Sequence, residues 1–421
     1  MSKKIQTPQT STQTPAQSFQ TNSYPAQTQT PAQPPADSAQ NRVEEARQRL
    51  LAVESALNKL VIGHENVVKA LMTALTAREH IVLIGPPGTA KTMLATTAAK
   101  LLGAKCYTYL MTRFTTPEEL FGMFDILALN NGELKRRWTS IVDSELAFLD
   151  EIFKGSGPIL NTLLSLMQER VIYDAATGQP MATKLWTLIG ASNEVPLEEE
   201  LQAVYDRFAV RVFLQYLDDD NKLLEALMAR WVNSTTPKQL ATMDDVRVLH
   251  EFAVTLLRSK IKNLGEVVKL YFVNAAPLIK TLRSRGVMVS DRMVIEKFAL
   301  LYASRLALYG ITPENIVNAI YDTIPLIART PQEAAEIQKV IEDSLGEVAE
   351  LSKKLEQAKS MLKKDEEGAL KIFKEIASYD VSRLANKPWL KPRVEAIIRV
   401  AQDYAQKTQQ IIQQKKALLE G

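Results

Sequence analysis

A glycine-rich stretch between a short apolar run and a helical pattern holds the residues best suited to phosphate chemistry. Ile81–Ile84 has the length of a strand, and the stretch that follows it reads Gly-Pro-Pro-Gly-Thr-Ala-Lys-Thr. Small residues let successive backbone N–H groups and a helix N-terminus surround a polyphosphate. In such a site Lys91 would reach the β- and γ-phosphates, and the Thr92 hydroxyl would ligate Mg²⁺. The expected binding residues are Gly85, Pro86, Pro87, Gly88, Thr89, Ala90, Lys91 and Thr92.

One position departs from the usual pattern of a phosphate loop, which is G-x-x-x-x-G-K-[ST]. Ala90 stands where that pattern has its second glycine, and it adds one methyl group where the helix begins, which such a loop can tolerate. The alternative is a glycine-rich turn between a strand and a helix that binds nothing. The strand before the stretch and the helix after it favour the phosphate loop.

Two carboxylates follow a second apolar run. Residues 146–149 are apolar, and Asp150 and Glu151 come directly after them. Asp150 would hold the water shell of Mg²⁺, and Glu151 would polarise the attacking water as a general base. Paired acids are common on surfaces, but downstream of a phosphate loop they are informative. The two strands can lie side by side in one parallel sheet, with their carboxyl ends at one crevice.

Two more polar residues extend the candidate site. Asn193 follows an apolar run at residues 186–192 and could orient the attacking water or the γ-phosphate, although an asparagine at a strand end is ordinarily a turn former. Arg207 precedes a further expected strand at residues 210–214. Its planar guanidinium could neutralise charge that develops on the nucleotide of a neighbouring subunit. The alternative for Arg207 is a surface position in a loop.

Other segments complete the expected surroundings. A break between two helical patterns upstream of the phosphate loop could cover an adenine base through Ile62 and Gly63, unless it is a plain turn between helices. We expect one hairpin with strands at residues 126–129 and 134–137 around an Asn-Gly turn, and a second within residues 171–184. Such insertions could touch a substrate on the axial side of a ring.

Composition limits the class of protein. The 421 residues carry a formal net charge of +3, which gives no global attraction to nucleic acid. The single cysteine, Cys106, excludes an internal disulfide framework and suits a reducing interior, and the histidines show no metal-ligand spacing. No apolar run approaches the roughly 20 residues needed to span a bilayer, and the N-terminus lacks the apolar core of a secretory signal. We therefore expect a cytoplasmic protein.

The chain resembles the AAA+ ATPases of the MoxR family in its motifs and in the placement of its two hairpins. Residues 111–122 and 159–164 look closest to the RavA-like branch of that family, and Ala90 is similar to what MoxR proteins show. The resemblance covers about residues 45–310. The segments that carry it are residues 85–92, Leu149-Asp150-Glu151-Ile152-Phe153-Lys154, Ser192-Asn193-Glu194 and Asp206-Arg207-Phe208.

The resemblance implies roles for individual residues. Asn193 would be sensor 1, Arg207 the arginine finger, and Arg292, which follows a helix cap at Ser290, sensor 2 of the lid. Arg170 is a weaker candidate for a second intersubunit contact. The resemblance further implies ATP and Mg²⁺ as cofactors, a homo-oligomeric ring that we expect to be a hexamer, and a partner with a von Willebrand factor A domain.

The expected fold is α/β, a P-loop AAA+ domain with a doubly wound parallel sheet, a helical lid and an α-helical C-terminal extension. Heptads of apolar residues run through residues 337–362 and 397–418, which favours an antiparallel coiled-coil hairpin over a surface for partner docking. RavA-like proteins carry a β-rich insertion in this arm that the sequence lacks, so the partner of that insertion is not inferred. The expected domains are a disordered tail (1–40), the nucleotide-binding domain (41–215), the lid (216–330) and the extension (331–421).

The function expected from these motifs is ATP hydrolysis coupled to remodelling of protein complexes, in cofactor insertion or complex maturation. Two other classes of function stay open. A nucleic-acid-dependent motor related to replicative helicases would place Lys135, Arg136 and Arg137 on phosphates, but the near-neutral net charge makes nucleic acid an unfavoured partner. A nucleotide-gated scaffold without catalysis is disfavoured by the complete set of catalytic residues.

Overall fold

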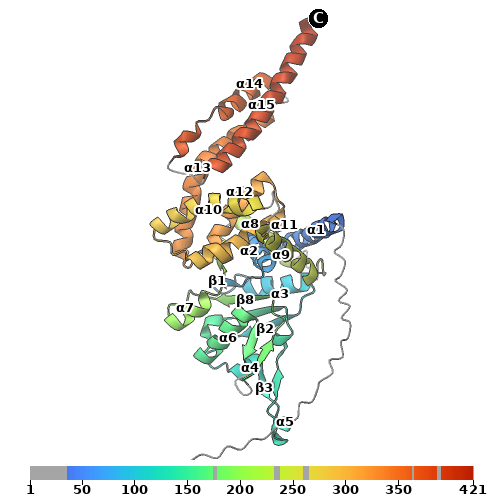
Figure 1. Cartoon of the computed structure of the whole chain (residues 1–421), viewed down its shortest axis with the longest axis vertical. Helices are drawn as coiled ribbons and strands as arrows, with labels where there is room; N and C mark the ends of the chain where they lie inside the picture. The colour runs from blue at the N-terminus through green and yellow to red at the C-terminus, as the bar shows by residue number, and fades with distance from the viewer. Residues whose placement is uncertain are drawn as a thin grey trace, which may run out of the picture.

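A five-stranded parallel sheet forms the centre of the molecule (Figure 1). The computed structural model describes the chain except for residues 1–35, 174–177, 232–237, 259–264, 363–364, 386–389 and 421. The strand order is β2-β5-β8-β1-β9, so the carboxyl ends of all five strands lie at one edge. The strands are β1 (Ile81–Ile84), β2 (Cys106–Leu110), β5 (Leu146–Asp150), β8 (Thr187–Ser192) and β9 (Val210–Phe213).

Helices cover both faces of the sheet, as expected for a doubly wound fold. Along β1 the side chains alternate, because successive residues of a strand point to opposite faces. Ile81 and Leu83 belong to one apolar cluster with helices α1, α2 and α3, and Val82 belongs to another with α6 and α7. These helices are α1 (Ala36–Leu60), α2 (Glu65–Ala77), α3 (Lys91–Leu101), α6 (Gly157–Glu169) and α7 (Glu199–Tyr205).

One inserted hairpin differs from the prediction. The strand expected at residues 126–129 is a short helix, α5 (Ile126–Asn130), because the Asp125 carboxylate accepts hydrogen bonds from the first backbone N–H groups of that turn. The paired strands are instead β3 (Gly122–Phe124), which follows α4 (Pro117–Phe121), and β4 (Arg136–Trp138). The second hairpin forms as expected, from β6 (Val171–Tyr173) and β7 (Pro180–Ala182).

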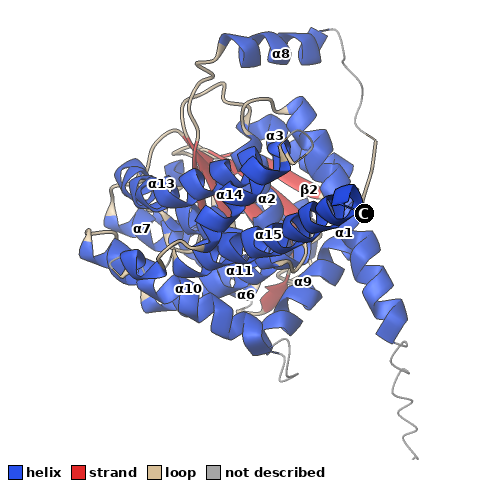
Figure 2. Ribbon diagram, turned by 90° about the horizontal axis from the view of Figure 1, so that it is seen from above, coloured by secondary structure: helices blue, strands red, loops and turns tan. Residues whose placement is uncertain are grey.

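The lid is helical, as expected, and has its own apolar cluster. Ser290 and Thr312 cap helices as predicted, with Pro313 in the first turn after Thr312. The segment after Ser290 differs from an ordinary helix, because η3 (Met293–Phe298) is a π-helix. Figure 2 shows α8 set apart from the other helices. The lid helices are α8 (Asp220–Trp231), α9 (Met243–Arg258), α10 (Gly265–Ser284), α11 (Ala299–Tyr309) and α12 (Pro313–Thr323).

Three helices form the C-terminal extension, which projects from the lid at the end opposite α5 (Figure 1). Side chains from all three, such as Leu351, Phe373 and Ala401, share one apolar cluster. The heptad expected from residue 337 onward is wrong at its start, because Ile337 and Ile341 pack into the cluster of the lid. The helices are α13 (Pro331–Met361), α14 (Glu366–Ala377) and α15 (Lys391–Glu420); the short 3-10 turns are η1 (Ser140–Val142), η2 (Ile152–Lys154), η4 (Ile324–Ile327) and η5 (Val381–Leu384).

The first described residues are helical. Helix α1 begins at Ala36, directly after the last proline of the N-terminal segment, so residues 36–40 are not part of a disordered tail as predicted. Proline disfavours the helical conformation in the residue before it, so a helix starts more readily after this segment than within it. The rest of the predicted tail, residues 1–35, lies outside the described residues. None of the helices that the structure describes is both long and apolar enough to cross a membrane.

Candidate functional site

The phosphate loop joins β1 to α3 at the carboxyl edge of the sheet. A side chain at Gly85 would place its Cβ 2.5 Å from the Leu214 carbonyl oxygen, so only glycine lets these backbones approach. Gly88 has a φ of +81°. Ala90 has a φ of 60°, a left-handed conformation that costs an alanine roughly 1–2 kcal/mol. The methyl group at residue 90 is therefore tolerated, but with strain.

Lys91 lies in the first turn of α3 with its ammonium turned back over the loop. Nζ donates hydrogen bonds to the carbonyl oxygens of Gly85 at 2.6 Å and Pro86 at 2.9 Å. Burial lowers the pKa of Lys91, and the nearby carboxylates of Asp150 and Glu151 oppose this shift. The ammonium group of Lys91 therefore lies close enough to interact electrostatically with Asp150 and Glu151, the two acids expected to share its site.

The carboxylates do not come from the strand next to β1. The prediction that the two strands lie side by side is wrong, because β8 pairs with β1 on one side and with β5 on the other. Asn193 therefore stands between the phosphate loop and Glu151, and its Nδ2 donates a hydrogen bond to Glu151 Oε1 at 2.7 Å. Lys154 Nζ lies 3.5 Å from the other carboxylate oxygen, Oε2. Both oxygens of Glu151 thus have partners.

A cavity of about 460 Å³ opens beside the phosphate loop. Its lining includes Ile62 and the loop residues 88–90, so the break between α1 and α2 reaches the position expected for a base-covering segment. Gly63, which was expected to cover the base together with Ile62, is not among the residues that line the cavity. It has a φ of +80°, and a Cβ there would lie 2.2 Å from Leu217 Cδ2. Burial lowers the pKa of the neighbouring His64. The cavity is large enough for an organic ligand of nucleotide size.

The donor set at this edge fits a nucleotide with a hard divalent cation. Thr92 is exposed at the start of α3, and Asp150 ends β5 at the same edge. Among the residues described, no group of three or more His, Cys, Asp or Glu side chains could hold a metal ion. Mg²⁺ is typically held by one or two protein ligands together with substrate phosphates and water, and these two residues match that pattern.

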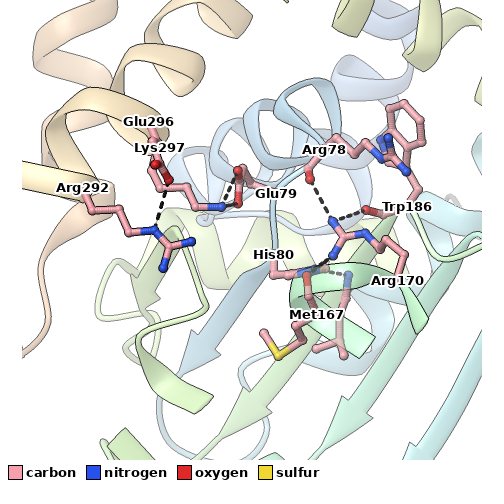
Figure 3. A network of polar contacts seen from close by, with 10 residues as sticks. Arg78, Glu79, His80, Met167, Arg170, Trp186, Arg292, Glu296 and Lys297 are labelled. Atoms are coloured by element: carbon pink, nitrogen blue, oxygen red, sulfur yellow. Dashed lines mark hydrogen bonds and ion pairs between the residues drawn. The ribbon is translucent and has the colours of Figure 1, made fainter. Parts of the chain in front are cut away.

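The predicted arginines gather at the opposite edge of the sheet. Arg207 precedes β9, at the amino end of the strands, and lines a second cavity of about 480 Å³. Arg170, Arg292 and Lys297 line the same cavity, which we call the basic cavity (Figure 3). None of these four is among the residues that line the cavity beside the phosphate loop. The arginines therefore face away from the phosphate loop of their own chain.

The three arginines differ in how firmly they are held. The guanidinium of Arg170 donates to the carbonyl oxygens of Met167, Arg78 (3.1 Å) and Trp186 (3.3 Å). Burial lowers the pKa of Arg170 to about 10, and the charge of Arg78 adds to the shift. Arg292 and Arg207 are held by fewer hydrogen bonds. Arg292 Nε donates to the exposed Glu296 carboxylate at 3.0 Å. Arg207 Nε is buried with no hydrogen-bond partner among the described residues.

The cavity also contains groups that sequence reasoning missed. Glu79 accepts from Lys297, and His80 accepts from the Leu188 N–H through Nδ1 and bonds the Met167 carbonyl through Nε2. Lys154, at the carboxyl edge, belongs to a motif of the family resemblance, but the sequence indicates no role of its own for it. The spacing of three residues between Glu151 and Lys154 could have indicated their ion pair. No pattern in the sequence connects Glu79 with a lysine in the lid.

The basic residues of the first hairpin are engaged within the protein. Arg137 Nε donates to the Asp125 carboxylate at 2.9 Å, and Lys135 pairs with Glu133. The Arg136 guanidinium lies 4.3 Å from the ring centroid of Phe124. These contacts give each of the three cations a partner within the hairpin, while the side chains of Arg137 and Lys135 stay 69% and 66% exposed.

Comparisons with known proteins cover the part of the chain that contains the phosphate loop, Glu151 and Arg207. Residues 48–251 match a family described as "MoxR domain in the MoxR-vWA-beta-propeller ternary systems". Uncharacterized protein MJ0812 of Methanocaldococcus jannaschii is 33% identical over 242 residues, which make up 57% of this chain and 61% of that protein. The chaperone MoxR1 of Mycobacterium tuberculosis is 23% identical over 333 residues, 68% of this chain and 85% of MoxR1.

A solved structure extends the likeness to the fold. A protein from Cytophaga hutchinsonii, provisionally named an ATPase, superposes with a TM-score of 0.55 at 22% identity, over 73% of this chain and 96% of that one. Sequence identity at this level supports the shared fold alone. The chain spans 61% of the length of MJ0812 and 55% of that of MJ0079 from the same organism. The family match includes Arg207, and it ends before Arg292 and the C-terminal extension.

Proposed function

We propose that this chain hydrolyses ATP and uses the reaction to remodel protein complexes, because residues 48–251 match a MoxR-domain family and the chain is similar to the chaperone MoxR1. The observation that carries the proposal is the convergence of Lys91, Glu151 and Asn193 at the carboxyl edge of the sheet, beside a cavity of about 460 Å³. A cation for the phosphates, a base for water and an amide that fixes the base are the protein groups that phosphoryl transfer to water uses.

Each residue at this edge has its own task in the proposed reaction. The backbone N–H groups of residues 88–90 and the N-terminus of α3 hold the phosphates, and Lys91 exchanges its two carbonyl partners for phosphate oxygens. Thr92 and Asp150 hold Mg²⁺, which neutralises phosphate charge when bound. Glu151 accepts the proton of the attacking water, and Asn193 holds the carboxylate of Glu151 in place. Ile62 covers the base.

The reaction we propose takes place between subunits. Arg207 and Arg292 line the basic cavity, on the edge of the sheet opposite to the phosphate loop. In a head-to-tail ring the basic cavity of one copy meets the nucleotide cavity of the next, and a rotation that closes gives a ring of identical contacts. Arg207 then neutralises the charge that develops in the transition state. A hexamer is the ring size that the family resemblance suggests.

The partner we propose is a protein with a von Willebrand factor A domain. The matched family is described by systems that combine a MoxR domain, such a domain and a β-propeller. Cofactor insertion or maturation of a multisubunit complex is the task that such a partnership would serve. Membership of the RavA-like branch is suggested only by residues 111–122 and 159–164 and stays a prediction.

The test is ATP hydrolysis by the full chain with Mg²⁺. We expect Glu151→Gln to bind ATP and to hydrolyse it about 10²- to 10⁴-fold more slowly, because the variant lacks the general base. Lys91→Ala should lose ATP binding itself and serves as the control for retention of ligand. Turnover by Glu151→Gln at the wild-type rate would show that the proposed mechanism is wrong.

The same variant tests the client. Glu151→Gln loaded with ATP and Mg²⁺ should stall with its client bound, so affinity capture from native extract, compared with Lys91→Ala, identifies what is retained. Recovery of a von Willebrand factor A protein or of one enzyme complex supports the remodelling function. Nuclease-sensitive recovery of replication proteins would overturn it in favour of the nucleic-acid motor.

A further inference from the structure

A buried ion pair in the basic cavity joins the sheet domain to the lid. Glu79 lies in the connection between α2 and β1, and both of its carboxylate oxygens lie 2.7 Å from Lys297 Nζ (Figure 3). The Glu79 side chain is 9% exposed and that of Lys297 is 28% exposed. The charge of Glu79 is therefore largely removed from water, and its principal compensation comes from the lid.

Lys297 and Arg292 are linked by the π-helical geometry of the lid segment that carries them. Segment η3 begins directly after Arg292 and contains Lys297. A π-helix closes its hydrogen bonds over five residues, so residues five apart lie close to one face. In an α-helix the neighbours on one face are three and four apart. Arg292 and Lys297, five apart, accordingly line the same cavity.

We propose that Glu79 is a positioning residue for the intersubunit reaction: by holding Lys297, it fixes the π-helical segment so that Arg292 stands beside Arg207, toward the nucleotide of a neighbouring copy. This inference rests on the proposed function, because only an ATPase that works between subunits gives these arginines a reaction to serve. Glu79 itself touches no reacting atom in this scheme.

Stability alone gives little reason for this ion pair. Replacing a buried ion pair by apolar side chains of similar volume is often neutral or stabilising, because both charges must be desolvated. The lid is already joined to the sheet domain by apolar contacts, since Leu301 and Leu308 of α11 belong to the same cluster as β1. An ion pair also fixes the position of the lysine, because both carboxylate oxygens contact the ammonium group.

The electrostatics of the cavity agree with a positioning role. Burial raises the pKa of the Glu79 carboxyl, while the charges of Lys297, Arg170 and Arg292 oppose this shift. The field of three cations therefore converges on one carboxylate. If Glu79 were neutral, these cations would repel one another across the basic cavity, and Arg292, whose side chain is 55% exposed and pairs with the exposed Glu296, would be the least confined of them.

The experiment compares two isosteric changes of carboxylate to amide. Glu79→Gln removes the pair in the basic cavity, and Glu145→Gln removes a matched pair, in which Glu145 lies 2.6 Å from Arg247 of α9. Glu145 also joins the sheet domain to the lid, but it does not line the basic cavity. We expect Glu79→Gln to lower kcat by about 10- to 100-fold at an unchanged dissociation constant for ATP, as a displaced catalytic group does. Glu145→Gln should keep the wild-type kcat.

Mixing of variants separates positioning from folding. Glu79→Gln subunits keep their own phosphate loop and Glu151, and Glu151→Gln subunits keep an intact basic cavity. A mixture of the two should hydrolyse ATP faster than either variant alone. The positioning role is overturned if Glu79→Gln retains the wild-type kcat, if the mixture gains nothing, or if kcat and thermal stability fall together in both glutamate variants.

The two proposals fail in different ways. If the wild-type chain does not hydrolyse ATP, or if Glu151→Gln is as active as wild type, the proposed function fails. If wild type and Glu151→Gln behave as expected and Glu79→Gln behaves like Glu145→Gln, only the positioning role fails.

Discussion

Left-handed backbone conformations mark both edges of the sheet. Among the described residues other than glycine, Arg78, Ala90, Glu151 and Arg170 have positive φ angles between 53° and 62°. Each such residue costs roughly 1–2 kcal/mol relative to an ordinary conformation. Ala90 lies in the phosphate loop, and Glu151 is the proposed general base at the same edge. Arg78 and Arg170 line the basic cavity. Strain therefore accumulates where the two proposed halves of the reaction lie, as it does at functional sites in general.

His80 gives the basic cavity a dependence on pH. Its Nδ1 accepts from the Leu188 N–H at 2.9 Å, so a neutral ring carries its proton on Nε2, which lies 2.8 Å from the Met167 carbonyl oxygen and also contacts the Arg170 guanidinium. Burial lowers the pKa of His80 well below 6.5, and the adjacent Arg170 adds to the shift. The folded protein thus holds a neutral imidazole where the unfolded chain would be protonated.

The sign of the effect follows from proton binding. Below pH 6.5 the unfolded state binds a proton that the folded state does not, so the free energy of unfolding falls on acidification, by up to about 1.4 kcal/mol per pH unit, until the lowered folded pKa is reached. We expect His80→Gln to be less stable at pH 7.5 but to lose less stability between pH 7.5 and 5.5. Urea unfolding at both values measures this difference. If wild type and variant lose the same free energy of unfolding between these pH values, the acid sensitivity comes from groups other than His80.

The elements were predictable where the signal is local. The strands of the sheet followed from their apolar runs, and the caps at Ser290 and Thr312 followed from residue type. Strand order was not predictable, because nothing in the sequence of β1 states that β8 is its neighbour. The helix α5 was missed because Asp125, a capping residue, lies just outside the run of apolar residues that suggested a strand. The π-helix η3 has no sequence signature comparable with a cap.

The candidate site divides in the same way. Residues of the phosphate loop and of the β5 end lie within motifs, so their positions followed from the sequence. The pairing of Glu79 with Lys297 spans 218 positions and depends on how the lid docks. Likewise the choice between Arg170 and Arg207 needed their hydrogen-bond partners, which only the folded chain supplies.

The connection between α1 and α2 has a steric role that a single methyl group tests. Gly63→Ala would place Cβ 2.2 Å from Leu217 Cδ2, and Leu217 lines the cavity beside the phosphate loop. Overpacking of this kind costs roughly 1–3 kcal/mol or displaces the neighbour. We expect ATP affinity to fall by about tenfold, equivalent to about 1.4 kcal/mol, in equilibrium titrations.

A matched glycine separates this contact from backbone strain. Gly132 has nearly the same φ, +78°, but a Cβ there would meet no atom within 4 Å. Gly132→Ala therefore introduces the left-handed strain without the contact, and it should keep the wild-type ATP affinity. Equal losses of affinity in both variants would mean that Leu217 does not transmit the change.

The whole molecule separates its two chemical surfaces. The phosphate loop, Glu151 and Asn193 lie at the carboxyl edge of one sheet, and Arg207 comes before the amino end of β9 in the same sheet. A single chain cannot bring these groups together without breaking the sheet. Under the proposed function each chain therefore carries only one half of the reaction site, which favours hydrolysis in an assembly. The extension lies beyond the lid, away from both edges (Figure 1).

The two candidate intersubunit arginines should fail in different ways when truncated. Arg170 is held by backbone carbonyls, so Arg170→Ala removes the donor of the partly buried Trp186 carbonyl, at about 1–3 kcal/mol, and should lower the free energy of unfolding. Arg207 Nε has no partner among the described residues, so Arg207→Ala should leave stability nearly unchanged and lower ATP turnover by about 10³- to 10⁵-fold. Mixing with Glu151→Gln should restore activity to Arg207→Ala, because each variant supplies the half-site that the other lacks. If Arg170→Ala instead keeps its stability, loses turnover and regains it on mixing, Arg170 is the arginine that acts on the neighbouring subunit.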